Sequence, residues 1–154
     1  MKKNIKQDTW DSRYMQMAQL VGSWSTCIRK NRQVGAIIVK DNIIISTGFN
    51  GAPGEIKSCV ERGECLRDKM GIESGTRQEL CYSVHAEQSA MMQAAKIGTS
   101  INGSTMYITH QPCSLCARMM INSGIVRIVY EQDYPDKFSL KLLKEAGIEV
   151  VKLK

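Results

Sequence analysis

Two short segments of the chain contain residues that could bind a metal ion. The segment "HAE" places His85 two positions before Glu87, and "PCSLC" places Cys113 and Cys116 three positions apart after a proline. Imidazole nitrogen and thiolate sulfur are common zinc ligands, and three protein ligands leave the fourth position of the ion open to water. The pattern therefore predicts a catalytic rather than a structural zinc site, with Glu87 as the one member that is not a ligand.

The expected chemistry is hydrolytic. Bound zinc lowers the pKa of water from about 15.7 to about 7, which makes hydroxide available at neutral pH. A carboxylate beside that water can take its proton and later deliver it to a ring nitrogen and a leaving amine. We therefore predict that His85, Cys113 and Cys116 bind zinc and that Glu87 is the catalytic proton carrier.

The two segments can meet only if each one starts a helix that points its amino end at the site. On a helix, His85 and Glu87 differ by about 200° in direction and cannot share a lateral face. The two cysteines lie on one side of a first turn, where the helix dipole favours thiolates. Either motif alone is weak, since a lone histidine is usually a cap or core residue and a lone C-x-x-C is often redox-active or structural.

Residues before position 50 are patterned as a helix followed by a strand pair. Apolar residues at helical spacing predict a core-covering helix from Trp10 to about Arg29, with Thr9 as its N-cap. The predicted apolar face consists of Trp10, Tyr14, Met17, Leu20, Val21, Trp24 and Ile28. The β-branched runs "QVGAIIV" and "IIISTGF", joined by a short polar turn, predict two antiparallel strands.

Residues after position 80 alternate between helix and strand. Helices are predicted over 84–97, 113–123 and 137–146, and the strands "STMYIT", "VRIVY" and "IEVVKL" lie between and after them. Such alternation implies parallel strands with right-handed crossovers. We expect a three-layer α/β/α sandwich with a mixed five-stranded sheet, in which the antiparallel hairpin joins an otherwise parallel set.

The stretch from about 50 to 80 is rich in glycine and charge and has no sustained period, so it is predicted to be a long excursion. Loops of this length are uncommon unless they are functional or pinned. The chain of 154 residues, 1–154, is otherwise expected to form a single domain.

Charge and hydropathy narrow the function classes. The apolar runs are too short to span a membrane and the amino end lacks a signal peptide, so a cytoplasmic location is the default expectation. The net charge of +6 suggests an anionic partner, but the basic residues are scattered. A phosphorylated small substrate fits this charge as well as a nucleic acid does.

With these motifs in view, the chain resembles the zinc-dependent cytidine and deoxycytidylate deaminase family, and within it the bacterial deoxycytidylate (dCMP) deaminases. The resemblance runs from about Tyr14 to Val151. It rests on "VGAIIVKDNIIISTGFNGAPGE", "HAEQSA", "YITHQPCSLCARMMINSGI" and "VRIVYEQDYPD". The "GFNGAPG" segment, followed by a cysteine-bearing insert, is the most specific for the deoxycytidylate branch.

The resemblance implies a cytidine deaminase-like fold and hydrolysis of dCMP to dUMP and ammonia by zinc-bound hydroxide attacking C4, which supplies dUMP for thymidylate synthesis. It further implies that the backbone N–H of Ala86 and the carbonyl of Gln111 fix the pyrimidine edge. Asn50 would hydrogen-bond the sugar, and Tyr134 would close over the nucleotide. The chain departs from the family's usual H-A-E-x-N-A at Ser89, a change that bears on sugar or phosphate selectivity and leaves the zinc chemistry intact.

The resemblance also implies a homo-oligomer, commonly a hexamer, and regulation by dCTP as activator, with Mg²⁺ bound to it, and dTTP as inhibitor. Neither a membrane nor a stable nucleic-acid partner is expected. Two alternatives use parts of the same pattern. A tRNA adenosine deaminase, or another zinc-dependent nucleoside or base deaminase, would share the zinc and Glu87, although a tRNA enzyme needs a positively charged groove. A non-catalytic zinc module would not need Glu87.

Four cysteines are left after the predicted catalytic pair, and two interpretations of them stay open. Their number suffices for a second, structural zinc that would pin the excursion, as some relatives carry an additional metal. They could equally be buried free thiols. The residues are Cys27, Cys59, Cys65 and Cys81.

Overall fold

A mixed five-stranded sheet is the centre of the fold. The computed structural model describes residues 5–154, so the first four residues of the predicted domain lie outside the described residues. The strands are ordered β2-β1-β3-β4-β5, and the β2-β1-β3 pairings are antiparallel whereas β3-β4-β5 are parallel. This arrangement confirms the predicted sheet. The strands are β1 (Gly35–Lys40), β2 (Ile43–Phe49), β3 (Thr105–His110), β4 (Arg127–Gln132) and β5 (Glu149–Lys152).

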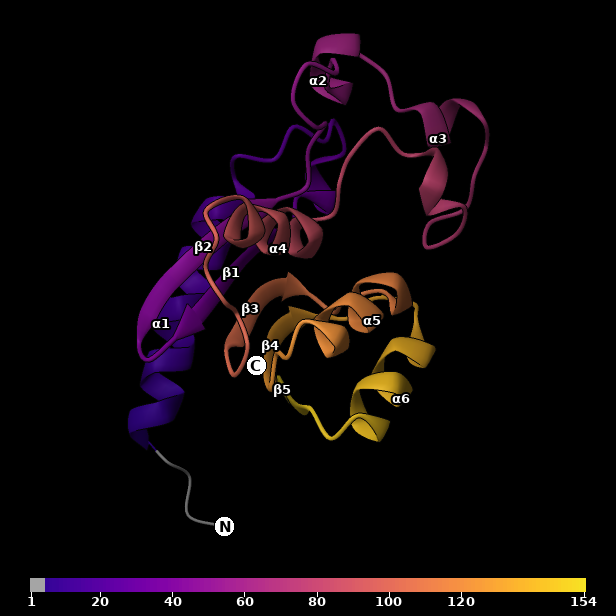
Figure 1. The fold of residues 1–154 in the computed structure, drawn as a ribbon. Helices are drawn as coiled ribbons and strands as arrows, with labels where there is room; N and C mark the ends of the chain where they lie inside the picture. The colour runs from indigo at the N-terminus through magenta and orange to yellow at the C-terminus, as the bar shows by residue number, and fades with distance from the viewer. Residues whose placement is uncertain (1–4) are drawn as a thin grey trace.

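Helices cover both faces of the sheet, which confirms the three-layer sandwich (Figure 1). Alternate residues of β1 point to opposite faces: Ile37 and Val39 pack under α1, whereas Ala36 and Ile38 pack under the helices of the second face. Because β1 is covered on both sides, its apolar run is nearly continuous rather than alternating. The helices are α1 (Ile5–Gly22), α4 (Ala86–Lys96), α5 (Ser114–Asn122) and α6 (Lys137–Glu145).

The predicted first helix was wrong at both ends. Thr9 lies inside α1 rather than at its N-cap, and the helix ends at Gly22 instead of continuing to Arg29. The backbone at the carboxyl end of α1 lies very close to Gly35 of β1. A Cβ atom on Gly35 would lie 2.0 Å from the Ala18 carbonyl oxygen and 2.3 Å from the Gly22 nitrogen. The end of α1 therefore packs directly on the backbone of β1, and the following residues turn away toward the excursion.

The buried face of α1 also differs from the predicted apolar face. Tyr14, Met15, Ala18 and Val21 are buried, whereas other apolar residues of the predicted face are exposed. A carboxylate completes the buried face, because Asp11 is only 2% exposed. Exposed members of the predicted face are Trp10, Met17, Leu20, Trp24 and Ile28.

Asp11 is stabilised by a buried polar network that links α1 to Tyr107 of β3 and Arg127 at the start of β4. Both Asp11 carboxylate oxygens accept hydrogen bonds from the Arg127 guanidinium, at 2.9 and 2.7 Å, and Tyr107 donates its hydroxyl at 2.8 Å. Burial alone would raise the pKa of Asp11, but these donors lower it below its ordinary value. A buried carboxylate is tolerated here because it is paired and fully hydrogen-bonded.

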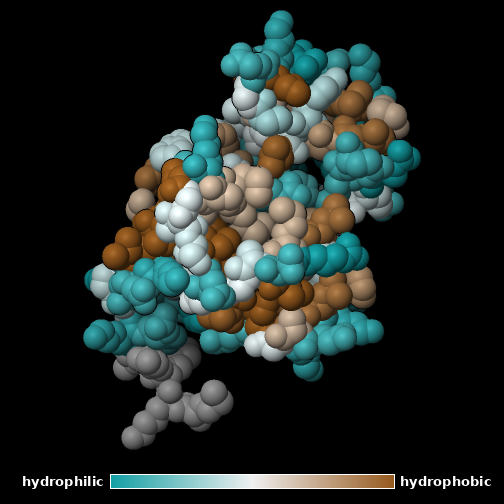
Figure 2. Space-filling view, in the orientation of Figure 1, coloured by the Kyte–Doolittle hydropathy of each residue, from teal (hydrophilic) through white to brown (hydrophobic). Residues whose placement is uncertain are grey.

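The excursion between β2 and α4 folds into short helices beyond the end of the layered body (Figure 1). Its outward surface is largely hydrophilic, as the upper part of Figure 2 shows. A further short helix, η1 (Lys30–Arg32), precedes β1. Within the described residues, none of the helices is long and apolar enough to cross a bilayer. The excursion contains α2 (Cys59–Arg62), α3 (Leu66–Lys69) and η2 (Gln78–Leu80).

Candidate functional site

The predicted metal ligands lie at the amino ends of two neighbouring helices, His85 and Cys113 just before the first turn and Cys116 within it. His85 immediately precedes α4 and Cys113 immediately precedes α5, and both have extended backbone angles. A bridge between Gly51 and Val84 holds the His85 segment beside the end of β2, and the end of β3 leads into Cys113. The amino ends of both helices therefore point at one place, outside the carboxyl ends of β2 and β3, which is where α/β folds commonly bind ligands.

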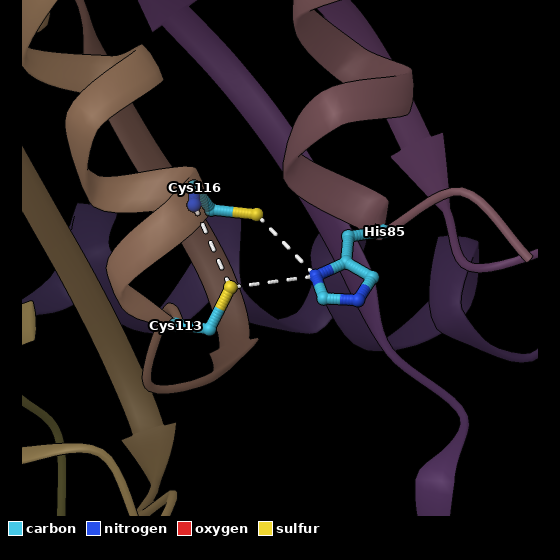
Figure 3. Close-up of side chains that lie close together, drawn as sticks. All are labelled: His85, Cys113 and Cys116. Atoms are coloured by element: carbon cyan, nitrogen blue, oxygen red, sulfur yellow. Dashed lines mark hydrogen bonds between the residues drawn. The ribbon is translucent and has the colours of Figure 1, made fainter. Parts of the chain in front are cut away.

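The three ligand side chains converge on one point (Figure 3). His85 Nδ1 lies 3.6 Å from the Cys113 sulfur and 3.4 Å from the Cys116 sulfur. For a tetrahedral zinc with Zn–N near 2.0 Å and Zn–S near 2.3 Å, these separations should be roughly 3.5 Å. The donor types and spacing therefore fit zinc. Within the described residues, this is the one group of three or more His, Cys, Asp or Glu whose ligand atoms lie within 4.8 Å of one another.

The two thiols differ in acidity. A hydrogen bond from the Cys116 thiol, together with His85, lowers the pKa of Cys113 to about 4 despite its burial. The same hydrogen bond, with burial, raises the pKa of Cys116. Burial on its own would lower the pKa of His85, but its contact with Cys113 and the charge of Glu87 raise it above the ordinary value. One thiolate is thus available before an ion binds, and a dication favours loss of the second thiol proton.

Glu87 lies beside this cluster and is almost completely buried, at 4% exposure. Burial raises the pKa of Glu87 to about 7, although the positive charge of His85 acts in the opposite direction. A carboxyl group with a pKa near neutrality can both accept and donate a proton at physiological pH. The burial of Glu87 therefore suits it to proton transfer.

A pocket opens beside the cluster and is lined by all four predicted substrate-contact residues. Its walls come from the loop before β1, the end of β2, the excursion, and the segments that follow β3 and β4. The predicted site residues that line it are Asn50, His85, Ala86, Glu87, Gln111, Cys113 and Tyr134.

Comparison with known protein families identifies the family to which this motif and fold belong. The family described as the cytidine and deoxycytidylate deaminase zinc-binding region matches residues 8–132. The chain belongs to this family.

Several individual relatives in the deaminase family are named deoxycytidylate deaminases. The deoxycytidylate deaminase of Saccharomyces cerevisiae is 36% identical over 95% of this chain, but the chain spans only 45% of that protein. The deoxycytidylate deaminase of enterobacteria phage T4 is 37% identical, over 90% of this chain and 87% of the phage protein. A crystal structure of the dCMP deaminase from cyanophage S-TIM5, in complex with dCMP and dUMP, is 32% identical, covers 99% of each chain and has a TM-score of 0.77.

In this deaminase-family chain, the side chain of Asn50 is held firmly in the pocket wall. Its Oδ1 accepts hydrogen bonds from the Val34 N–H at 2.8 Å and the Ser25 hydroxyl at 2.7 Å, and its Nδ2 donates to the Arg32 carbonyl at 2.7 Å. A carboxamide has two N–H donors. Among the described residues only one of them is engaged, so the second is available to a ligand.

Gln111 is fixed in a similar way. Its Nε2 donates to the carbonyl of Asp136 at 2.7 Å and contacts the Ser139 hydroxyl at 3.1 Å. Asp136 in turn accepts from the backbone N–H of Ser114 at the start of α5. The backbone around the second zinc-binding segment is therefore held by the loop between β4 and α6.

Tyr134, on that same loop, lies against the excursion. Its hydroxyl accepts a hydrogen bond of 2.8 Å from Gln78, and Gly75 packs beside Tyr134 and Pro135. The excursion and the β4–α6 loop thus contact each other at Tyr134, which lines the pocket.

Several pocket residues were not predicted from the sequence. They are basic or polar, and all except His110, at the end of β3, come from the loop before β1 and from the excursion, whose folded positions have no local sequence signal. A basic residue in a scattered set cannot be recognised as a pocket residue without knowing how the excursion folds back. The additional residues are Arg29, Arg32, Arg67, Ser74, Ser83 and His110.

The four remaining cysteines gather at one side of this pocket. Cys27, Cys65 and Cys81 line it, and Cys59 is buried within range of their charges. Burial and these neighbouring thiols raise the pKa of Cys27 and of Cys59. In the described part of the chain, however, they do not converge as closely as the His85 cluster does.

Proposed function

We propose that the chain is a dCMP deaminase that hydrolyses dCMP to dUMP and ammonia. The observation that carries this proposal is the convergence of His85, Cys113 and Cys116 beside the buried Glu87 at the floor of one pocket. Family membership and the likeness to the cyanophage enzyme crystallised with dCMP and dUMP support the choice of substrate.

The proposed cofactor is a zinc ion held by His85, Cys113 and Cys116, whose atoms and spacing suit it. When bound, zinc supplies Lewis-acid activation of a water molecule near neutral pH. The remaining chemistry belongs to residues of the chain.

Glu87 is proposed to move the protons of the reaction. The water oxygen bonds to C4 of the pyrimidine while Glu87 accepts a water proton and delivers it to N3. Glu87 then transfers the second water proton to the amino group, the C4–N bond breaks, and ammonia leaves as C4=O forms. The pKa of about 7 allows the carboxyl group to take up and release protons in turn.

The other pocket residues are proposed to orient the nucleotide. The backbone N–H of Ala86, at the start of α4, and the carbonyl of Gln111 would fix the pyrimidine edge. The remaining N–H of Asn50 would reach the sugar, and Tyr134 would cover the ring. The contact between Gln78 and Tyr134 ties the excursion to a residue of the pocket wall, which favours a mononucleotide over a folded RNA stem as the substrate.

The decisive experiment compares dCMP, CMP, deoxycytidine and cytidine in parallel by ultraviolet absorbance, with zinc content measured on the same sample. We expect turnover of dCMP above the other three. Absence of turnover on all four by zinc-loaded protein would overturn the proposal, and an adenosine-containing tRNA stem-loop would then be the substrate to test.

A second zinc at Cys27, Cys59, Cys65 and Cys81 is a separate part of this proposal. It is supported by the mutual proximity of the four thiols, and binding would draw the excursion closer to the loop after α1. We expect the wild type to contain two zinc ions per chain. The Cys59→Ser variant should contain one and should retain dCMP turnover. One zinc per chain in the wild type would show that the four are free thiols.

The predicted hexamer, the dCTP and dTTP effectors, and effector-bound Mg²⁺ stay predictions.

A further inference from the structure

One carboxylate caps two helices. Asp136 is the N-cap of α6, and its Oδ1 accepts a hydrogen bond of 3.1 Å from the Ser139 N–H. Its Oδ2 accepts a hydrogen bond of 2.7 Å from the N–H of Ser114, the first residue of α5. The two helices pack side by side on one face of the sheet, as Figure 1 shows. A single side chain therefore links the amino ends of both helices.

The hydrogen bonds to Asp136 are strong restraints on these helix starts. N–H groups in the first turn of a helix have no partner within the helix, and the helix dipole favours an anionic acceptor there. A carboxylate also forms stronger hydrogen bonds than a neutral acceptor does. Burial alone would raise the pKa of Asp136, but the Ser114 and Ser139 N–H groups lower it below its ordinary value. Asp136 is therefore ionised at neutral pH.

The restraint on α5 acts next to the predicted zinc ligands. Ser114 directly follows Cys113 and lies two positions before Cys116, so its backbone helps to set the direction of both thiols. Another contact in this first turn runs through a ligand itself, because the Cys116 N–H donates to the Cys113 sulfur at 3.5 Å. Asp136 instead holds the turn from a different element and uses no ligand atom.

The same residue holds the other end of the second zinc-binding segment. The Asp136 carbonyl accepts hydrogen bonds from Gln111 Nε2 at 2.7 Å and from the buried Ser139 hydroxyl at 2.8 Å. The backbone N–H of Gln111 donates to the Gln132 carbonyl at 2.7 Å. Residues 111–114 contain one predicted zinc ligand and the carbonyl proposed to fix the base, and Asp136 contacts both ends of this segment.

We propose that Asp136 is a positioning residue, which fixes Cys113 for the metal and the Gln111 carbonyl for the pyrimidine edge. This inference rests on the proposed deaminase function. Asp136 is not among the residues that line the pocket, so it acts through the backbone of residues 111–114. Removal of outer contacts that orient metal ligands typically changes metal affinity or activity by about 10- to 100-fold.

Asp136→Ser is the informative variant. A serine N-cap can still accept from the Ser139 N–H and preserve the start of α6, but its single, shorter side-chain oxygen cannot also serve Ser114. We expect the affinity of one zinc ion per chain, measured by competition with a chromogenic chelator, to fall about tenfold. At saturating zinc, kcat for dCMP should also fall about tenfold, because the reacting groups are misaligned. KM should change less than about threefold, since the backbone carbonyl that holds Gln111 is retained.

Removal of the donor tests the same hydrogen bond from the other side. Ser114→Pro deletes the N–H, and proline suits the first position of a helix when the preceding residue is extended, as Cys113 is at φ −75° and ψ 166°. This variant leaves the Asp136 cap of α6 in place and should also bind zinc about tenfold more weakly. Because the bond is then already absent, adding Asp136→Ser should weaken binding by less than about twofold. Additive losses would overturn the proposal.

The matched control for lower stability is Asp11→Ala, which removes a buried carboxylate of α1 that does not line the pocket. This variant should melt at a lower temperature but bind zinc as the wild type does. An equal loss of zinc affinity in Asp11→Ala and Asp136→Ser would show that stability alone is responsible, and the positioning role would be wrong. Melting temperatures identify any variant that fails to fold, and Ser114→Pro carries the test if Asp136→Ser is one of them.

The outcomes separate this inference from the proposed function. If the wild type deaminates dCMP but Asp136→Ser keeps the wild-type zinc affinity and kcat, the positioning role is overturned and the deaminase assignment stands. If the zinc-loaded wild type deaminates none of the four cytosine compounds, the deaminase assignment fails. Zinc affinity does not depend on turnover, so equal affinity in wild type and Asp136→Ser then overturns the positioning role as well.

Discussion

The Gln78 amide donates a 2.8 Å hydrogen bond to the hydroxyl of Tyr134, a residue that lines the pocket, and this contact joins segments that are 56 positions apart. We expect Gln78→Leu and Tyr134→Phe each to raise KM for dCMP about fivefold, as loss of one partly buried hydrogen bond would do. Because both variants remove the same bond, the double variant should be little worse than either single one. Steady-state kinetics measure KM for each variant. Gln93→Leu, a matched change outside the pocket, is the control.

Replacement of the buried carboxylate should separate metal binding from proton transfer. Glu87→Gln preserves the size of the side chain and leaves His85, Cys113 and Cys116 in place. We predict an unchanged zinc content and a fall in kcat of about 10²- to 10⁴-fold, the usual contribution of a general acid–base group. Near-normal turnover in this variant would show that another group carries the protons. The exposed Glu79→Gln is the matched control.

Removal of the metal should abolish activity reversibly. Dialysis of the zinc-loaded protein against a chelator is expected to eliminate dCMP turnover, and added Zn²⁺, but not Mg²⁺, should restore it, because the site offers one nitrogen and two sulfur ligands. Cys116→Ser should lose the metal and should not recover. Full activity at substoichiometric metal, measured by elemental analysis, would contradict the assignment of the cluster.

The buried ion pair at the opposite end of the sheet should affect stability and leave the chemistry unchanged. Asp11→Ala leaves Arg127 without its partner, and we expect a loss of about 3 kcal/mol in the free energy of unfolding by urea. Activity per folded molecule should stay the same, since neither residue lines the pocket. The exposed Asp8→Ala should change little.

The same pair predicts a pH dependence of folding. The folded-state pKa of Asp11 lies below its ordinary value, so its stabilisation is present above the unfolded pKa of about 3.9 and is lost as the pH falls through the folded value. The Asp11→Ala variant should therefore lose part of the acid dependence of stability that the wild type shows below about pH 4. Urea unfolding at a series of pH values measures the difference.

Much of the fold followed from periodicity. Alternation of helix and strand after residue 80 predicted the parallel strands and the crossovers, and the two β-branched runs predicted the hairpin. The prediction failed for α1. Apolar spacing suggested a helix that continued to Arg29, and most of the large side chains predicted to face the core are exposed in the structure. The buried face of α1 is instead set by the close packing of Ala18 and Gly22 against Gly35. No local sequence pattern reveals this contact.

The sequence by itself determined the metal-ligand set, because "HAE" and "PCSLC" are local motifs whose spacing already implies side chains at two helix amino ends. Only the tertiary structure decided which charges surround the pocket. Arg32 and Arg67 come from aperiodic segments, and their positions depend on distant contacts such as those of Asn50 with Arg32 and of Gln78 with Tyr134. Long-range packing of this kind is fixed by the folded chain as a whole, so residue types alone could not show it.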